Sequence, residues 1–263
     1  MRLTTLRQHQ IANEGPSTRS PSPTRNAIIL RFGGTQSLQI AMYRSAALAE
    51  IDPLDIHHAL QELRSAPASR AIFGAIGHKF VLYPVLSETE VLAFERKHRI
   101  SLPADYRGFL THVGNGGAGP YYGIFPLGQM DGNDKVKPWQ ENAGFVGVLS
   151  EPFLLSSDWN DLAGMPPDDL LEGDEEEYER QFDEFEKRYW RASLMNGAIP
   201  ICHEGCALRD WLVVTGEQAG RVWHDARADY KGLSPLMAPD GTPATFLLWY
   251  NDWLDRALRE ARS

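Results

Sequence analysis

A long helix, three strand-like segments and a second long helix follow one another between residues 174 and 258 of this 263-residue chain, and this order limits the folds open to it. Glycine-bearing turns separate the strand-like segments. Helices and strands also mix in the preceding residues, without the regular alternation that builds a doubly wound parallel sheet. The sequence therefore predicts an α+β fold. The strand-like segments are 198–203, 211–215 and 221–225.

Each of the two long helices carries its large apolar side chains on one face, which predicts that both pack against a core. In residues 174–191 four aromatic side chains recur at i, i+4, i+7 and i+11. The last helix is predicted to begin at Thr242 and Pro243, and its tryptophans are interpreted as packing residues rather than a ligand site. The apolar faces are Tyr178, Phe182, Phe185 and Tyr189 in the first helix, and Phe246, Trp249, Tyr250, Trp253, Leu254 and Ala257 in the last.

Shorter elements are predicted earlier in the chain from their start and stop signals. Asp52 and Pro53 are typical of the start of a helix, and Ser87 with Glu90 forms a capping box. The predicted elements are helices over 53–64 and 88–98, a helix that begins at Pro103 and stops at Gly114, and a strand over 121–127.

Acidic residues outnumber basic ones by 35 to 26, which gives a formal net charge of −9. The two signs are segregated: residues 1–80 hold nine Lys or Arg and five Asp or Glu, whereas residues 81–263 hold 17 and 30. An acidic main body repels nucleic acid and anionic membranes. We therefore expect a basic or neutral partner, and neither nucleic acid nor a membrane.

The expected location is the cytoplasm. Two cysteines, Cys202 and Cys206, cannot staple a chain of this size, which favours a reducing compartment. No apolar run approaches the ~18 residues of a membrane span, and the N-terminus lacks the apolar region of a secretory signal. An organelle transit peptide is the minor alternative, because the N-terminus contains Arg and Ser and few acids.

Two motifs resemble ligand sites only superficially. The glycine-rich run 115–119 follows a helix and precedes a strand, the reverse of the order in phosphate-binding loops, so it is interpreted as a tight turn. Cys202 and His203, with Cys206 three residues on, supply half of a zinc site, but no second pair has zinc-type spacing. We therefore predict no metal and no cofactor.

No pattern of nucleophile and base stands out in the chain. A G-x-S-x-G turn is absent, and a set made of Cys206, a histidine (His203 or His224) and Asp225 is the kind of combination that chance supplies. With 35 acidic residues, carboxylate pairs are equally uninformative. The sequence therefore predicts a protein that is not an enzyme, with a hydrolase as the weakest alternative.

A resemblance to the SUKH superfamily is carried first by residues 87–128, where a helix is followed by a second helix, a glycine-rich loop and an aromatic strand. It continues through the predicted strands to the last helix, and so covers about 84–258. The matching residues are Leu102, Pro103, Tyr106, Leu110, Gly114, Asn115, Gly116, Gly117, Pro120, Tyr122, Gly123, Ile124, Phe125, Ile199, Pro200, Gly205, Cys206, Trp249, Tyr250, Trp253 and Leu254.

This superfamily contains fungal cell-wall assembly regulators and many bacterial toxin-immunity proteins. The resemblance implies helices packed on a mixed, mostly antiparallel sheet, and a binding role without catalysis. The SUKH-like domain is expected over 84–258. Outside the resemblance, the Pro-, Ser- and Thr-rich composition of 13–26 predicts a flexible tail over 1–26, followed by a partly helical extension over 27–83. The function that the resemblance implies is stoichiometric neutralisation of a cognate toxin. The alternative is a regulatory scaffold in cell-wall synthesis or signalling.

The acidic segment 168–188 is the strongest indication of the partner. It holds 11 acids and three bases, and the i, i+4 pairs Glu176–Arg180, Asp183–Lys187 and Glu184–Arg188 leave most of its charge uncompensated. Such a field steers a basic surface, as nuclease toxins carry for their phosphate-containing substrates. The predicted partner-binding residues are Asp174, Glu175, Glu176, Glu179, Asp183 and Glu186, with Asn115 and Tyr121 from nearby loops.

Overall fold

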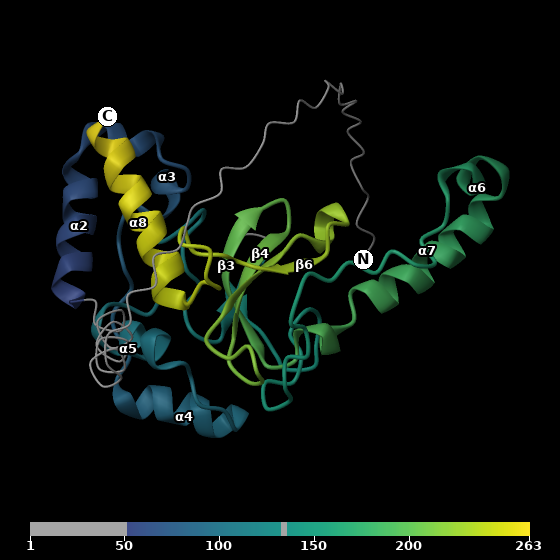
Figure 1. Ribbon diagram of the computed structural model, residues 1–263, viewed down its shortest axis with the longest axis horizontal. Helices are drawn as coiled ribbons and strands as arrows, with labels where there is room; N and C mark the ends of the chain where they lie inside the picture. The colour runs from purple at the N-terminus through teal and green to yellow at the C-terminus, as the bar shows by residue number, and fades with distance from the viewer. Residues whose placement is uncertain (1–51, 133–135) are drawn as a thin grey trace, which may run out of the picture. The chain divides into compact units, whose positions relative to one another are not determined.

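A four-stranded antiparallel sheet lies at the centre of the computed structural model, which describes residues 52–132 and 136–263 (Figure 1). The strand order is β3-β4-β5-β6, so each strand pairs with its neighbour in sequence. A two-stranded antiparallel ladder, β1-β2, precedes it. The α+β prediction is therefore confirmed. The strands are β1 Gln129–Met130, β2 Lys137–Pro138, β3 Ala198–Gly205, β4 Leu208–Val213, β5 Val222–Asp225 and β6 Leu233–Pro235.

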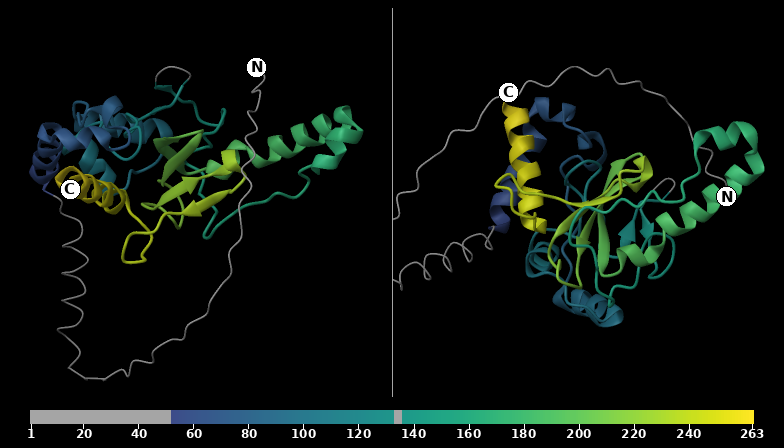
Figure 2. Two further views of the ribbon diagram at one scale, coloured as in Figure 1. Left: turned by 90° about the horizontal axis from the view of Figure 1, so that it is seen from above. Right: turned by 45° about the vertical axis from the view of Figure 1, so that its right-hand side comes forward.

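Helices α2 and α8 lie on one side of this sheet, and α6 and α7 extend away on the other side (Figures 1 and 2). All of them belong to the compact unit Ala47–Ser263. The predicted tail over 1–26 lies outside the described residues. The helices are α2 Pro53–Ser65, α3 Ala75–His78, α4 Glu88–His98, α5 Ala104–His112, α6 Asp168–Gly173, α7 Glu175–Tyr189 and α8 Phe246–Arg262, with 3₁₀ turns η1 Pro67–Ala71, η2 Ala192–Met195 and η3 Arg227–Asp229.

The predicted N-cap residues of α2 and α4 form capping hydrogen bonds in the structure. The Asp52 carboxylate accepts a hydrogen bond from the backbone N–H of Leu54 at 2.9 Å, which satisfies a free donor at the start of α2. The Ser87 and Glu90 side chains form the reciprocal capping box of α4. The predictions for these two helices are confirmed.

Two predicted elements differ because the sheet recruits their residues. The N-cap of α8 is Thr245, not Thr242, because Ala244 is held in extended form by backbone hydrogen bonds to Leu236 and Val222. The predicted strand 121–127 is reduced to isolated bridges of Ile124. Tyr121 and Gly123 there adopt positive φ values of 52° and 94°, which interrupt an extended strand.

The glycine-rich run is confirmed as a tight turn. Gly116 and Gly117 have φ values of 83° and 101°. A Cβ atom on Gly117 would lie 2.5 Å from the carbonyl oxygen of Val81, so no other residue fits without a shift. Backbone hydrogen bonds then join this turn to residues 81–83.

The apolar face of α8 forms the centre of the core. Tyr250 is fully buried and Trp253 is 6% exposed, and Trp253 contacts the rings of His78 and Phe80. From the other side, α2 packs on α8 and adds three buried aliphatic side chains to the same core. The tryptophans of α8 are therefore packing residues, as predicted. Within the described ranges, no helix has the length and apolarity needed to cross a membrane.

Replacing Trp253 by alanine is expected to lower the free energy of unfolding by about 3–5 kcal/mol, because it removes a large buried side chain and leaves a cavity. Chemical denaturation measures the change. Arg259→Ala on the exposed face of the same helix is the control and should alter stability by no more than about 0.5 kcal/mol. Equal effects of the two substitutions would contradict the core assignment.

Candidate functional site

A groove of about 520 Å³ opens beside the end of β3. One of its walls is the segment 122–126, and α3 and the turn at Gly205 and Cys206 contribute others. The Tyr122 ring stacks on His203 at 5.5 Å between ring centroids and meets Phe73 edge-on at 5.1 Å. Phe73 and Tyr122 are each more than half exposed. Exposed aromatic side chains around a hollow are typical of binding surfaces.

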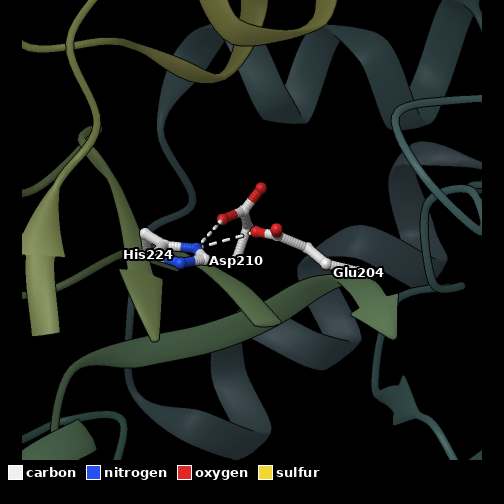
Figure 3. Close-up of side chains that lie close together, drawn as sticks. All are labelled: Glu204, Asp210 and His224. Atoms are coloured by element: carbon white, nitrogen blue, oxygen red, sulfur yellow. Dashed lines mark hydrogen bonds and ion pairs between the residues drawn. The ribbon is translucent and has the colours of Figure 1, made fainter. Parts of the chain in front are cut away.

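Three titratable side chains converge on neighbouring strands of the sheet (Figure 3). Glu204, Asp210 and His224 come from β3, β4 and β5, and their ligand-type atoms lie within 4.8 Å of one another. His224 Nδ1 is 2.7 Å from Glu204 Oε1 and 3.3 Å from Asp210 Oδ1. We call these three residues the carboxyl–histidine cluster.

The sheet register brings the cluster together. Asp210 and His224 are direct cross-strand partners, and strand residues alternate between the two faces. A neighbouring helix adds to its bonding: the Trp249 indole N–H of α8 donates to Asp210 Oδ2 at 3.0 Å. The cluster therefore connects the sheet and α8.

Burial and mutual contact shift every pKa in the cluster. Burial, together with the nearby Glu204 carboxylate, raises the pKa of Asp210 to about 7. Hydrogen bonds to Asp210 and Glu204 raise the pKa of His224 to about 10. Burial opposes ionisation of Glu204, but hydrogen bonds from His224 and Asp210 outweigh it and lower the pKa of that carboxyl. At neutral pH the His224 imidazolium lies beside the Glu204 carboxylate, and Asp210 is close to its pKa and is protonated in part of the molecules.

The side chains of the cluster are joined by hydrogen bonds in this structure. Its donor types suit a divalent cation, and each of the three side chains offers one ligand atom. A tetrahedral ion with bonds of about 2.0 Å separates its ligand atoms by about 3.3 Å. The 2.7 Å between His224 Nδ1 and Glu204 Oε1 is instead a hydrogen-bond distance.

The catalytic set considered from the sequence is not assembled around His224. His224 bonds to the carboxyl–histidine cluster on one face of β5. Asp225, the next residue, points to the other face and pairs there with the fully buried Arg227 at 2.6 Å. Cys206 lies exposed at the rim of the groove. Asp225 therefore does not orient His224 as a base.

Five of the predicted partner-binding residues follow one line along α7. Successive helical residues are rotated by about 100°, so the five side chains fall within an arc of roughly 100° beside the buried aromatic stripe. Four are exposed and Glu186 is half-buried. Within the described residues, none of the five forms an ion pair. We call them the acidic strip: Glu175, Glu176, Glu179, Asp183 and Glu186.

The two arginines of α7 are occupied elsewhere, and the predicted pair Asp183–Lys187 is not among the ion pairs of the described residues. Arg180 pairs with Glu177 at 2.6 Å and Glu184 at 2.8 Å, not with Glu176 as predicted. Arg188 forms an ion pair with Asp161, which lies outside α7, and not with Glu184. These pairs lie outside the acidic strip, whose charge is therefore not compensated by them.

The other three predicted residues have different surroundings. The Asp174 carboxylate caps α7 by accepting from the backbone N–H of Glu177 at 3.1 Å. Asn115 accepts from the backbone N–H of Leu127 at 2.8 Å and so holds its own loop. The Tyr121 ring meets Phe73 edge-on, with 6.4 Å between ring centroids. The structure thus brings five predicted residues together on α7 and places Asn115 and Tyr121 in other contacts.

The carboxyl–histidine cluster was not predicted from the sequence, because its residues are brought together by the register between strands. One signal was available: Asp210 directly precedes a predicted strand, so a charged side chain stood next to residues expected to be buried. Neither the pairing with His224 nor the approach of Trp249 follows from spacing along the chain.

We expect His224 to make stability decrease as pH rises. A pKa raised from 6.5 to about 10 stabilises the fold fully below pH 6.5, and this contribution is lost as pH rises through about 10. The contribution of Asp210 is present below pH 3.8 and is already lost as pH rises through about 7. Between pH 7 and 10 the melting temperature of the wild type should therefore fall more steeply than that of His224→Gln.

Melting curves at a series of pH values measure this difference. His58→Gln, which removes an exposed histidine of α2, is the matched control and should follow the wild-type slope. Parallel curves for the wild type and His224→Gln would show that the imidazolium does not stabilise the fold.

Comparison with known proteins gives one assignment. The family model of the SMI1/KNR4 family (SUKH-1) matches residues 85–235. This range is more than half of the chain and contains the sheet, α7 and the carboxyl–histidine cluster. Searches of curated proteins and of solved structures found no significant match. The SUKH resemblance noted in the sequence is thus confirmed, and the chain belongs to the SMI1/KNR4 family (SUKH-1).

Proposed function

We propose that this chain is an immunity protein that binds a cognate, nuclease-type toxin in the cytoplasm and blocks it stoichiometrically. SUKH domains generally serve as binding domains in immunity or regulation. In the proposed mechanism the chain masks the basic surface with which the toxin holds phosphates. No turnover, cofactor or metal takes part.

The acidic strip carries this proposal. Its five carboxylates point the same way and are not paired with cations of the described chain. The strip lies on a helix that extends away from the sheet, which leaves room for a partner (Figures 1 and 2). Like charges held together produce a field that attracts a basic surface before contact and raises the association rate.

Contact residues for the bound state are proposed from the same helix and from the loops. Glu186 is half-buried, and burial together with Asp183 raises its pKa, so part of the strip already stands in a reduced dielectric. A basic group that approaches it there is less screened by water and salt. Asp174, Asn115 and Tyr121 remain proposed contacts at the edge of the interface.

Reversing the acidic strip to lysine at all five positions should abolish electrostatic steering. We expect the association rate with the toxin domain to fall by about tenfold or more at low salt, and the salt dependence of the rate to flatten. Stopped-flow or surface-based kinetics at several salt concentrations measure both quantities.

A matched control reverses five exposed acids elsewhere, so the net charge changes equally. Suitable positions are Glu151, Asp158, Glu217, Asp255 and Glu260. If the association rate falls by the same factor in both variants, the effect is due to net charge and not to the acidic strip on α7. If the strip variant binds like the wild type, acidic masking is wrong.

The partner itself is found by affinity capture from the host's lysate and secreted fraction at low and high salt, read by mass spectrometry. A large secreted protein with a small basic C-terminal domain, released by salt, identifies the toxin for the kinetic experiment. A set of signalling or wall-synthesis proteins would instead support the regulatory scaffold and contradict the immunity proposal.

A further inference from the structure

A surface of exposed apolar side chains borders the groove and continues past it. The Tyr83 side chain lines the groove and also lines a second hollow of about 400 Å³, so the two hollows adjoin. The second hollow is lined by residues of α2 and of the segment 80–85. Neighbouring exposed apolar side chains mark interaction sites, whereas single ones need no explanation. We call the following residues, each between 46% and 56% exposed, the apolar surface: Phe73, Val81, Tyr83, Val85 and Tyr122.

One backbone edge beside the second hollow is unpaired. The Val81 carbonyl accepts from the backbone N–H of Ala118 at 2.8 Å. The Tyr83 N–H donates to the Gly116 carbonyl at 3.0 Å. Leu82 lies between these two bonds, at the position of an antiparallel bridge whose own N–H and C=O point away from the partner segment. Within the described residues neither group of Leu82 forms a hydrogen bond. Free backbone groups of this kind are a template for an added strand.

The border of the second hollow is basic. His57 and Arg64 line it from α2. The acids of that helix, Asp55 and Glu62, lie on its opposite face, because successive helical residues are rotated by about 100°. The sequence from 63 to 87 holds three Lys or Arg and no acid, in a chain whose formal net charge is −9. Within the described part of the chain, none of these three cations forms an ion pair. A partner that complements this border therefore carries carboxylates.

We propose that the apolar surface is a docking site for an extended, acidic and apolar segment of a second protein. The segment adds a short strand beside Leu82, seats apolar side chains in the groove and in the second hollow, and places a carboxylate on Arg64. The proposal does not rest on the proposed function, because the acidic strip attracts a partner surface of the opposite charge.

A polypeptide segment fits this surface better than a lipid bilayer or a second copy of the chain. A bilayer also takes apolar and basic side chains, but its core offers no hydrogen-bond partner to the backbone groups of Leu82. A symmetric pair of copies would place the same surface of both against each other. The unpaired cations of the two copies would then meet and repel. An acidic segment satisfies both the backbone edge and the basic border.

The wall between Phe73 and Tyr122 is already rigid. The Tyr121 carbonyl oxygen occupies the space over Gly74, where an added Cβ would lie only 1.5 Å away. On either side of this contact the Phe73 ring meets the Tyr122 ring edge-on, with 5.1 Å between ring centroids. A preformed surface loses little conformational entropy when a partner binds, which favours affinity.

Selection of phage-displayed random dodecapeptides on the purified full chain tests the proposal. We expect the enriched peptides to carry two apolar side chains at alternating positions, which share one face of a strand, and at least one Asp or Glu. Fluorescence polarisation with a labelled copy of an enriched peptide then gives its Kd. Enrichment of basic peptides alone, or no enrichment, would overturn the proposal.

Matched variants locate the bound peptide on the protein. Tyr83→Ser should raise the Kd at least tenfold, and Arg64→Glu should do so at low salt and less at high salt. Two controls should keep the wild-type Kd: Leu154→Ser, which changes an exposed side chain outside both hollows, and Arg259→Glu, which makes the same change of charge on α8. Reversal of the acidic strip should also leave the Kd unchanged. A wild-type Kd in Tyr83→Ser or in Arg64→Glu would contradict the docking site.

Single N-methylation of the peptide's amides tests the added strand without any change to the protein, and so does not depend on the folding of a variant. Successive amides of a strand point to opposite sides. Methyl groups should therefore weaken binding at alternate central positions and be tolerated between them. A uniform effect, or none, would show that the backbone edge of Leu82 is not used.

Two further measurements test the other occupants of the apolar surface. Vesicles that contain phosphatidylserine should not bind the wild type through this surface, and sedimentation should show no dimer that Tyr83→Ser abolishes. Vesicle binding lost in Tyr83→Ser would assign the surface to membranes, and a dimer lost in that variant would assign it to a second copy. Either result would overturn the proposal.

Discussion

A carboxylic acid buried at 1% exposure needs partners for both of its oxygens, and in this chain the partners of Asp210 come from different parts of the fold. His224 approaches from the neighbouring strand and the Trp249 indole from the C-terminal helix. Because an unsatisfied buried carboxylate is costly, α8 is held to one position over the sheet. The core packing of α2 on α8 depends on that position.

The parts of the fold that sequence reasoning predicted are those fixed by neighbours along the chain. The Ser87–Glu90 capping box and the apolar stripes of α7 and α8 depend on spacing within one turn or a few turns. The start of α8 was displaced because Ala244 is held by Leu236 and Val222 across the sheet. Pairing between distant residues overrides a local helix signal, and no local pattern announces it.

The candidate sites divide in the same way. The acidic strip could be predicted because helical spacing alone aligns its five carboxylates. The carboxyl–histidine cluster could not, since it needs the β3–β4–β5 register and the approach of α8. Tyr121 was selected as a partner contact for its place in a loop, and its ring packs edge-on against Phe73 within the protein. Side chains on loops acquire their roles from contacts that are distant in sequence.

The contact between Gly74 and the Tyr121 carbonyl has a consequence for redesign of the groove. The segments around Gly74 and Tyr121 meet with no room for a methyl group between them, so they behave as one rigid unit, although more than forty positions separate them in the chain. An insertion or deletion in either would push the other out of register with β3. Attempts to retarget the groove should therefore exchange residues 72–78 and 120–123 together, as a graft, and vary exposed side chains such as Tyr122 within it.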